Sequence, residues 1–192
     1  MDLQRFCHEY RGKGSLSTPF SRGDYTYATD GRMIVRVPRL KDMPERDNAP
    51  KADHLGWNHS ELSDWTNPPK IDLSGTEKCS LCKGSGKATV CPECDGEGEV
   101  VAETAMNEYE VTCKTCEGDG ATAGGKDMCS SCDGTGLYID NPVKYGSRYI
   151  GGLLLAKMSI LPDLQFSHYG GIEDAVRFIF DGGEGLVMPF RV

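Results

Sequence analysis

Four copies of one pattern run from residue 79 to residue 136: Cys79-Ser-Leu-Cys82-Lys-Gly-Ser-Gly86, Cys91-Pro-Glu-Cys94-Asp-Gly-Glu-Gly98, Cys113-Lys-Thr-Cys116-Glu-Gly-Asp-Gly120 and Cys129-Ser-Ser-Cys132-Asp-Gly-Thr-Gly136. Each copy reads C-x-x-C-x-G-x-G. Two thiolates separated by two residues hold a metal ion from a tight turn, and four thiolates complete a closed tetrahedral zinc site. Glycine allows positive φ, so the turn can wrap behind the sulfur atoms. The four half-sites therefore predict two structural Zn²⁺ ions.

The spacing of the half-sites predicts how they pair. Eight residues separate the first and second half-sites, 18 the second and third, and 12 the third and fourth. Zinc ribbons have about 15–20 residues between their two cysteine pairs, and only the middle gap fits. The predicted inner site is Cys91, Cys94, Cys113 and Cys116. The predicted outer site is Cys79, Cys82, Cys129 and Cys132, and this nested pairing would bring the two ends of the segment together, as an insertion into another domain requires.

Two other interpretations of the cysteines stay open. A disulfide scaffold is disfavoured because the half-sites follow metal spacing and because Met1–Gln4 lacks the features of a signal peptide. A thiol–disulfide exchange enzyme would use a C-x-x-C pair, and zinc occupancy argues against it. Since the sequence has no phosphate-binding loop and no recognisable catalytic grouping, we expect a protein that is not an enzyme.

The four repeats resemble the cysteine-rich zinc domain of DnaJ-type co-chaperones. In that family the outer half-sites share one zinc and the inner half-sites share the other. The resemblance implies a domain of β-hairpins with little regular structure that binds polypeptide, and it gives a chaperone-like character to residues 79–136. The sequence contains no His-Pro-Asp tripeptide and no Gly/Phe-rich linker, so the resemblance does not extend to a J domain.

Charge is concentrated around the repeats. The chain of 192 residues has a net charge of −8, and residues 71–140 contain 14 acidic and 5 basic side chains, a net charge of −9. An acidic segment repels the phosphate backbone of nucleic acid. The charge therefore favours an acidic arm that is presented to a protein partner, although solubility alone is an alternative reason for it.

The rest of the chain predicts a separate α+β body. Removing 79–136 from 192 residues leaves 134, which is enough for a hydrophobic core. No apolar run approaches the roughly 18 residues of a membrane span, and the reduced thiols suggest the cytoplasm. We expect helices at 2–10 and 147–158, a hairpin at 24–37, strands near 164–168, 176–180 and 186–192, and a loop at 38–70 with a short helix between Trp57 and Trp65. His54 and His59 in that loop are expected to face solvent.

Both ends of the body carry a second resemblance. Leu186-Val-Met-Pro-Phe-Arg-Val192 and Tyr27-Ala-Thr-Asp-Gly31 are similar to stretches of the bacterial DNA polymerase sliding clamp. The resemblance implies one clamp-like domain of antiparallel strands and two helices, with its parts at 1–74 and 137–192 and the finger at 75–136. A clamp ring needs six such domains, and helix 147–158 offers DNA only Arg148 and Lys157. A clamp-like, replication-associated factor that contacts nucleic acid through this body is therefore the alternative function.

We expect a non-catalytic zinc-binding module that binds a protein or an unfolded polypeptide. The predicted contact region is a hairpin at 99–112, between the inner half-sites, with Val101, Tyr109 and Val111 as the binding residues. Brief strands at 71–74 and 137–140 are expected to form the two arms that lead into and out of the finger.

Overall fold

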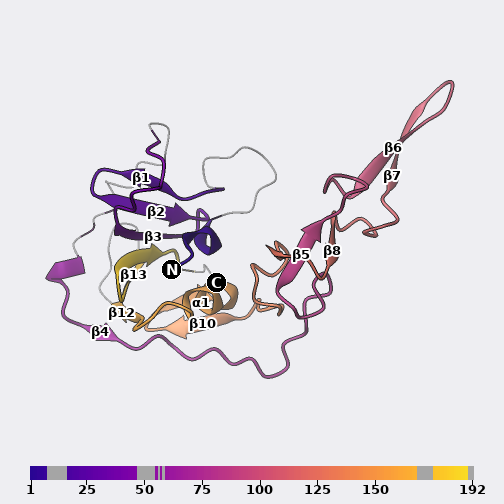
Figure 1. Cartoon of the computed structure of the whole chain (residues 1–192). Helices are drawn as coiled ribbons and strands as arrows, with labels where there is room; N and C mark the ends of the chain where they lie inside the picture. Colours follow the sequence, from indigo (N-terminus) through magenta and orange to yellow (C-terminus); the bar gives the residue numbers. More distant parts are fainter. Residues whose placement is uncertain (8–16, 47–54, 56, 58, 168–174, 190–192) are drawn as a thin grey trace. The chain divides into compact units, whose positions relative to one another are not determined.

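The computed structural model describes residues 1–7, 17–46, 55, 57, 59–167 and 175–189. They form two compact units, which we call the body (residues 1–72 and 140–192) and the finger (residues 73–139) (Figure 1). Tyr10, His54, His168 and residues 190–192, which entered the sequence predictions, lie outside the described residues. The domain limits at 75 and 136 stay a prediction.

The body is built on a seven-stranded antiparallel sheet in the order β1-β2-β3-β14-β13-β12-β4 (Figure 1). The predicted hairpin around Asp30-Gly31 is present as β2 and β3, with Thr29 opposite Ile34. The strands are β1 (Phe20–Arg22), β2 (Tyr25–Thr29), β3 (Met33–Pro38), β4 (Trp65–Thr66), β12 (Gln165–Ser167), β13 (Val176–Phe180) and β14 (Gly183–Val187).

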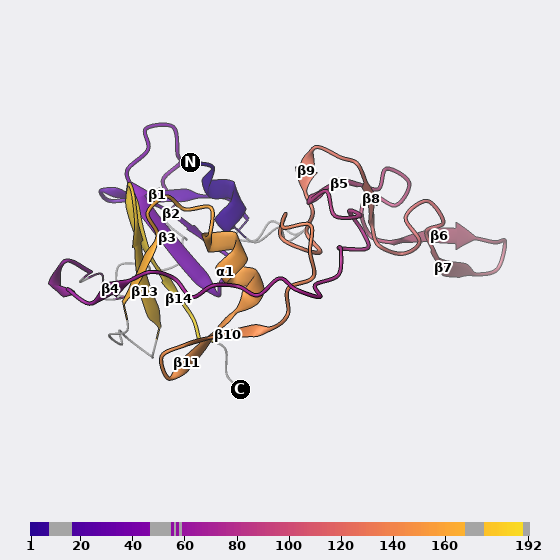
Figure 2. The same cartoon turned by 90° about the horizontal axis from the view of Figure 1, so that it is seen from below.

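The sheet is covered on both faces. Successive residues of a strand point to opposite faces, so Val35 and Ile34 enter different cores. Val35 packs with Phe178 and with Leu155 of α1 (Gly152–Met158) in the larger core, and Figure 2 shows α1 lying against that face. Ile34 belongs to a smaller core on the other face. Apolar residues on both faces of β3 explain why its burial is nearly continuous.

The second face also buries polar side chains. The Arg36 guanidinium lies between two rings, 4.1 Å from the centroid of Tyr25 and 4.0 Å from that of Trp57, and it pairs with Glu184. The prediction that His59 faces solvent is wrong. Its side chain is stacked between Trp57 and Trp65, its Nε2 lies 3.0 Å from the Gly185 carbonyl oxygen, and burial lowers its pKa.

The helices are shorter than the sequence predicted. At 147–158, Arg148–Gly151 form β11, which pairs with β10 (Pro142–Tyr145), and only Gly152–Met158 is α-helical. Gly146 has φ +61° and makes the tight turn that sends the chain back along β10. Ser147, the first residue of the predicted helix, therefore lies in this turn. Lys157, one of the two basic residues that this helix was expected to offer DNA, is buried and bonds to Asp30 at 3.1 Å.

At the N-terminus a 3₁₀ turn, η1 (Leu3–Phe6), stands where the sequence predicted a helix, and it ends at Cys7, which has extended backbone angles. Residues 8–10 of that prediction lie outside the described residues. Cys7 is buried, and burial raises its pKa to about 11, so the thiol stays protonated at neutral pH. A second 3₁₀ turn, η3 (His59–Glu61), stands where a short helix was expected between the tryptophans. The described body therefore has one α-helix where two helices were predicted.

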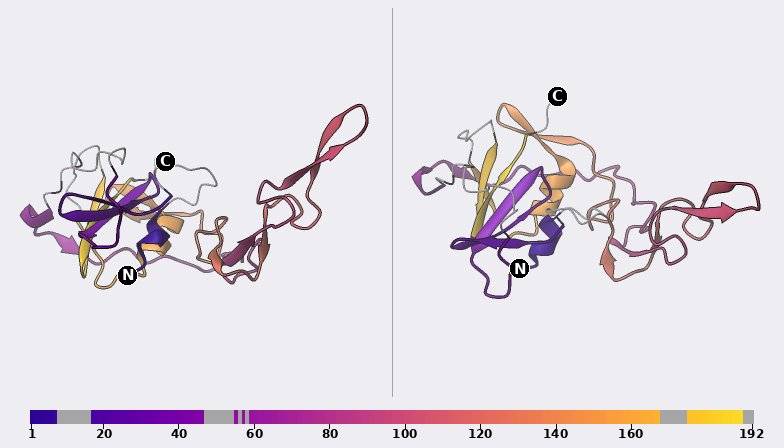
Figure 3. Two further views of the ribbon diagram at one scale, coloured as in Figure 1. Left: turned by 45° about the horizontal axis from the view of Figure 1, so that its top comes forward. Right: turned by 90° about the horizontal axis from the view of Figure 1, so that it is seen from above.

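The finger contains five short strands: β5 (Lys87–Val90), β6 (Glu99–Glu103), β7 (Glu108–Thr112), β8 (Ala121–Ala123) and β9 (Asp127–Met128). They form a sheet in the order β8-β5-β9 and a separate hairpin, β6-β7, which Figure 3 shows as a two-stranded ribbon. The predicted arms at 71–74 and 137–140 do not form strands. Residues 137 and 138 of the second arm do pair with the entering chain, but with residues 77 and 78 instead of 71–74: Tyr138 N–H donates to Glu77 O at 3.0 Å, and Lys78 forms an isolated bridge with Leu137.

None of the helices among the described residues is long and apolar enough to cross a membrane.

We predict that the body folds without the finger, since the larger core draws its buried residues from segments that lie outside 73–139. In the test variant a short Gly/Ser linker joins Glu77 to Tyr138, which are already hydrogen-bonded neighbours. The expected result is a cooperative thermal transition followed by circular dichroism. Loss of a cooperative transition, with the full-length chain as control, would show that the finger is part of the body's folding unit.

Candidate metal centres

The eight cysteines of the repeats gather in two groups of four, and all eight are buried. Within each group the sulfur atoms all lie within 4.8 Å of one another. One group joins the first and fourth half-sites, and the other joins the second and third, which is the nested arrangement that the spacing predicts. The groups are Cys79, Cys82, Cys129 and Cys132, and Cys91, Cys94, Cys113 and Cys116.

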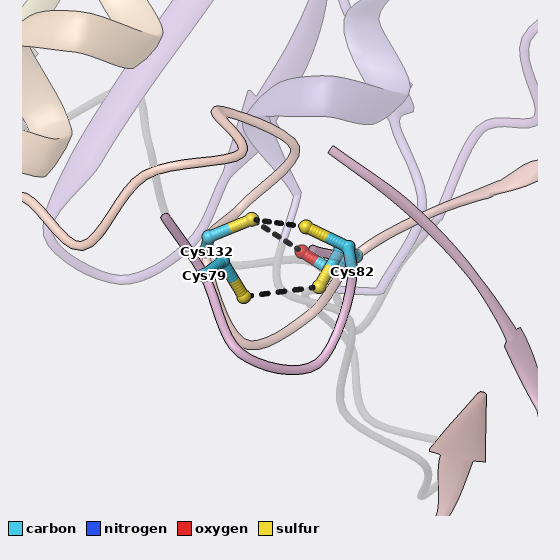
Figure 4. Close-up of side chains that lie close together, drawn as sticks. Cys79, Cys82 and Cys132 are labelled. Atoms are coloured by element: carbon cyan, nitrogen blue, oxygen red, sulfur yellow. Dashed lines mark hydrogen bonds between the residues drawn. The ribbon is translucent and has the colours of Figure 1, made fainter. Parts of the chain in front are cut away.

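The sulfur separations fit a tetrahedral zinc ion. A Zn–S distance of about 2.3 Å places the sulfur atoms of a tetrahedron about 3.8 Å apart. In the outer group Cys79 Sγ lies 3.9 Å from Cys129 Sγ, and Cys82 Sγ lies 3.7 Å from Cys132 Sγ (Figure 4). The matching distances in the inner group are 3.8 and 3.7 Å. A disulfide would need about 2.05 Å, so the geometry suits a shared ion and not a covalent bridge.

The same loop presents the sulfur atoms in all four repeats. In the first repeat the N–H of the last glycine, Gly86, donates to Cys82 Sγ at 3.3 Å, and the other three repeats have the equivalent bond at 3.2 Å. Lys83, the residue after the second cysteine, has φ +54°, and its counterparts Asp95, Glu117 and Asp133 have similar values. An N–H that points at a sulfur stabilises the thiolate form that a metal requires.

The two loops that share a group of four cysteines are also joined by reciprocal backbone hydrogen bonds. Cys79 N–H donates to Gly136 O at 2.9 Å, and Cys129 N–H returns the bond to Gly86 O at 3.0 Å. In the inner pair Cys113 donates to Gly98 O at 2.9 Å, and Cys91 donates to the last glycine of the third repeat at 3.0 Å. A β-carbon on Gly86 would lie only 2.3 Å from the Gly134 carbonyl oxygen. The final glycine of the motif is therefore required by the facing loop as well as by its own positive φ.

The thiols differ in acidity. Burial alone would raise the pKa of Cys79, but hydrogen bonds from Cys82 and the backbone of Leu81 outweigh it and lower that pKa to about 6. Burial raises the pKa of Cys113 to about 12 and also raises that of Cys129. Some sulfur atoms of each group therefore keep a proton at neutral pH without metal. Zinc must displace those protons, so its affinity falls as the pH falls.

Glu93 lies beside the inner group and was not singled out from the sequence. Its Oε2 accepts from the Cys113 thiol at 3.5 Å and from the Thr115 hydroxyl, and the hydroxyl bond is the main reason that the pKa of Glu93 is lowered. The position inside the second C-x-x-C pair was the only sequence signal for it. A carboxylate at this place adds negative charge next to the inner group of cysteines.

The structure places the predicted protein-binding residues on the β6–β7 hairpin, and all three are exposed: Val101 by 61%, Tyr109 by 52% and Val111 by 42%. They do not share one surface. Val101 pairs with Glu110, whereas Tyr109 pairs with Ala102 and Val111 with Val100. Directly opposed residues lie on the same face of a hairpin and neighbours along a strand alternate. Val101 is therefore on one face, and Tyr109 and Val111 are on the other.

Comparison with known proteins identifies the finger. Residues 79–136 match the family model of the DnaJ central domain. The DnaJ central domain binds two Zn²⁺ ions, and the two groups of four cysteines fit that content. The match covers the finger alone, so it leaves the body unassigned.

Relatives share the same region. The chain is 38% identical over 71 residues to the chaperone protein DnaJ of Methylobacterium sp., covering 34% of this chain and 18% of that protein. It is 35% identical over 75 residues to the DnaJ homolog subfamily A member 1 homolog of Dictyostelium discoideum, covering 34% and 16%. The DnaJ protein homolog xdj1 of Schizosaccharomyces pombe is 29% identical over 108 residues, covering 50% and 26%.

The chain thus spans about a quarter or less of the length of these relatives. No solved structure matches the chain. The clamp-like description of the body therefore stays a prediction.

We predict that cysteine substitutions separate the two DnaJ-type metal sites. Cys94→Ser with Cys116→Ser should remove one zinc per chain, and so should Cys82→Ser with Cys132→Ser, because each pair damages one group. The mixed pair Cys82→Ser with Cys94→Ser should damage both groups. Elemental analysis after dialysis measures the content, and a mixed variant that keeps one full zinc would contradict the nested arrangement.

We also predict that Gly86→Ala is more damaging than Gly124→Ala. Both positions have positive φ, but a β-carbon at Gly124 meets nothing within 4 Å, whereas one at Gly86 meets the Gly134 carbonyl. Backbone strain alone costs about 1–3 kcal/mol, and only Gly86→Ala should in addition release the outer zinc. Zinc release to a chromogenic chelator compares the two, and equal release rates would show that contact between the loops is unimportant.

Proposed function

We propose that this chain is a non-catalytic module in which two zinc ions, each ligated by four cysteines, hold the β6–β7 hairpin in position for a polypeptide partner. The observation that carries the proposal is the hairpin itself. All its residues are exposed except Val100, which is half-buried, and no other strand among the described residues pairs with its outer edges. Exposed strand edges bind extended polypeptide by adding a strand.

The donor set supports a structural role for the metal. Four thiolates complete the tetrahedral shell of zinc and leave no position for water or substrate. The finger has few large buried apolar side chains. Its buried clusters consist mainly of the eight cysteines, with Leu81, Ala88 and Ala121. Zinc binding contributes about 10–16 kcal/mol to the folding of finger peptides, so metal is the main source of the finger's stability.

The comparisons and the charge support polypeptide over nucleic acid. Several of the matched relatives are named chaperone proteins, and chaperones bind other polypeptides. The hairpin, residues 99–112, contains four glutamates and no lysine or arginine. Proteins that bind nucleic acid need clustered basic side chains to neutralise phosphates.

The proposal predicts binding of a reduced, unfolded protein by the zinc-loaded chain, without measurable binding of DNA at physiological salt. Fluorescence anisotropy with a labelled unfolded protein, a duplex and a single strand makes the comparison. Cys94→Ser with Cys116→Ser should abolish binding, because the inner group fixes the base of the hairpin through the bond from Cys113 N–H to Gly98 O. Salt-sensitive DNA binding with no polypeptide binding would contradict the proposal and favour the replication-associated alternative.

A further inference from the structure

The register of the β6–β7 hairpin sorts its side chains by chemistry. The opposed pairs Val100–Val111 and Ala102–Tyr109 alternate along the ribbon with Glu99–Thr112, Val101–Glu110 and Glu103–Glu108. Because opposed residues share a face, one face is apolar throughout and the other bears every glutamate of the hairpin. The apolar face consists of Val100, Ala102, Tyr109 and Val111, and the acidic face of Glu99, Val101, Glu103, Glu108, Glu110 and Thr112.

The acidic face is not neutralised by ion pairs among the described residues. Glu103 and Glu108 stand directly opposite each other, an arrangement of like charges that destabilises a strand pair. None of the four glutamates forms an ion pair in the part of the chain that the structure describes. A cationic partner would remove this repulsion, and so charge complementarity indicates the sign of the partner's charge.

The two strands differ in what they offer along their outer edges. β7 reads Glu108-Tyr109-Glu110-Val111, a strict alternation in which all four side chains are exposed. On β6 the apolar-face residues are a small alanine and Val100, which is half-buried against the inner cysteines. A strand added to β7 would therefore meet large exposed apolar groups on one face and carboxylates on the other.

We propose that the segment bound by the finger is an extended strand that alternates basic and apolar residues and pairs along the outer edge of β7. This deepens the proposed function and rests on it. An added strand continues both faces of the hairpin, because its side chains alternate as those of β7 do. Its basic residues would lie beside Glu108 and Glu110, and its apolar residues would lie beside Tyr109 and Val111.

The first test uses the full zinc-loaded chain and labelled synthetic peptides. The probe is Lys-Val-Lys-Val-Lys-Val-Lys with glycine-serine flanks. One comparison peptide has the same composition in two blocks, all lysines before all valines, and another replaces each lysine with glutamate. The alternating basic peptide should bind about tenfold more tightly than the block peptide, because only alternation lets lysines face both carboxylates while valines face Tyr109 and Val111. The glutamate peptide should not bind measurably.

The second test changes the β7 edge. Glu108→Gln with Glu110→Gln should weaken binding of the basic peptide about fivefold and flatten its salt dependence. The matched control, Glu77→Gln with Asp127→Asn, removes the same charge from exposed positions of the finger outside both the hairpin and the four repeats, and should change neither. Tyr109→Ser with Val111→Ser should weaken binding, whereas Val101→Ser, on the other strand and face, should not. Zinc content of two ions per chain checks that each variant is folded.

A charge-reversal variant distinguishes a specific loss of peptide binding from a general loss of structure, because a misfolded chain would bind neither peptide. Glu108→Lys with Glu110→Lys should reverse the preference, so that the glutamate peptide binds and the lysine peptide does not. Equal binding of alternating and block peptides, or equal effects of the β7 and control substitutions, would overturn the inference. If the unfolded protein still bound in that case, the proposed function would stand without it; if no polypeptide bound at all, both would fall.

Discussion

The finger depends on one interaction, the pairing of two C-x-x-C-x-G-x-G loops through reciprocal hydrogen bonds, which brings four sulfur atoms together. Each loop donates a cysteine N–H to the last glycine carbonyl of the other, and the sulfur atoms then stand 3.7–3.9 Å apart across the pair. Thiolates at that distance repel one another, and a divalent cation removes the repulsion. Metal binding and loop pairing are therefore one event, which lets a segment with few large buried side chains keep a defined shape.

The pairing of the two inner loops, from the second and third repeats, also sets the register of the hairpin. The hairpin begins at Glu99, directly after Gly98, and ends at Thr112, directly before Cys113. Cys113 N–H donates to Gly98 O at 2.9 Å, so the two ends of the hairpin are held side by side. A slip of one residue in either strand would move the glutamates of that strand onto the apolar face. The turn at the tip, where Thr104 N–H donates to Asn107 O at 2.8 Å, closes the other end. The inner metal site thus fixes the register of the hairpin, and the register places the glutamates on one face and the apolar side chains on the other.

The metal sites could be predicted from the sequence because all their determinants are local and repeated: the cysteine spacing selects the partners, and the glycines mark the turns. The hairpin at 99–112 was predictable for the same reason. The face of each side chain was not, because that requires the register. In the body, alternation predicted β2 and β3, but the burial of His59 depends on tryptophans and on Gly185, which is 126 positions away. The predicted start of the helix at residue 147 was wrong because the apolar pattern there suits a helix or a strand equally. The turn at Gly146 and the pairing with β10 select the strand.

Body and finger use charge in opposite ways. In the body, Lys157 pairs with Asp30 and Arg36 with Glu184, and both cations are buried. Removing either carboxylate would leave a buried charge without that partner, which is far more costly than losing an exposed pair. The Lys157–Asp30 pair therefore ties α1 to the turn between β2 and β3, and the Arg36–Glu184 pair links the neighbouring strands β3 and β14. The hairpin glutamates are exposed and gathered on one face, where their removal costs little stability. Among the described residues no ion pair uses these carboxylates, so they remain available to a partner at the end of a hairpin whose base is closed beside the inner group of cysteines.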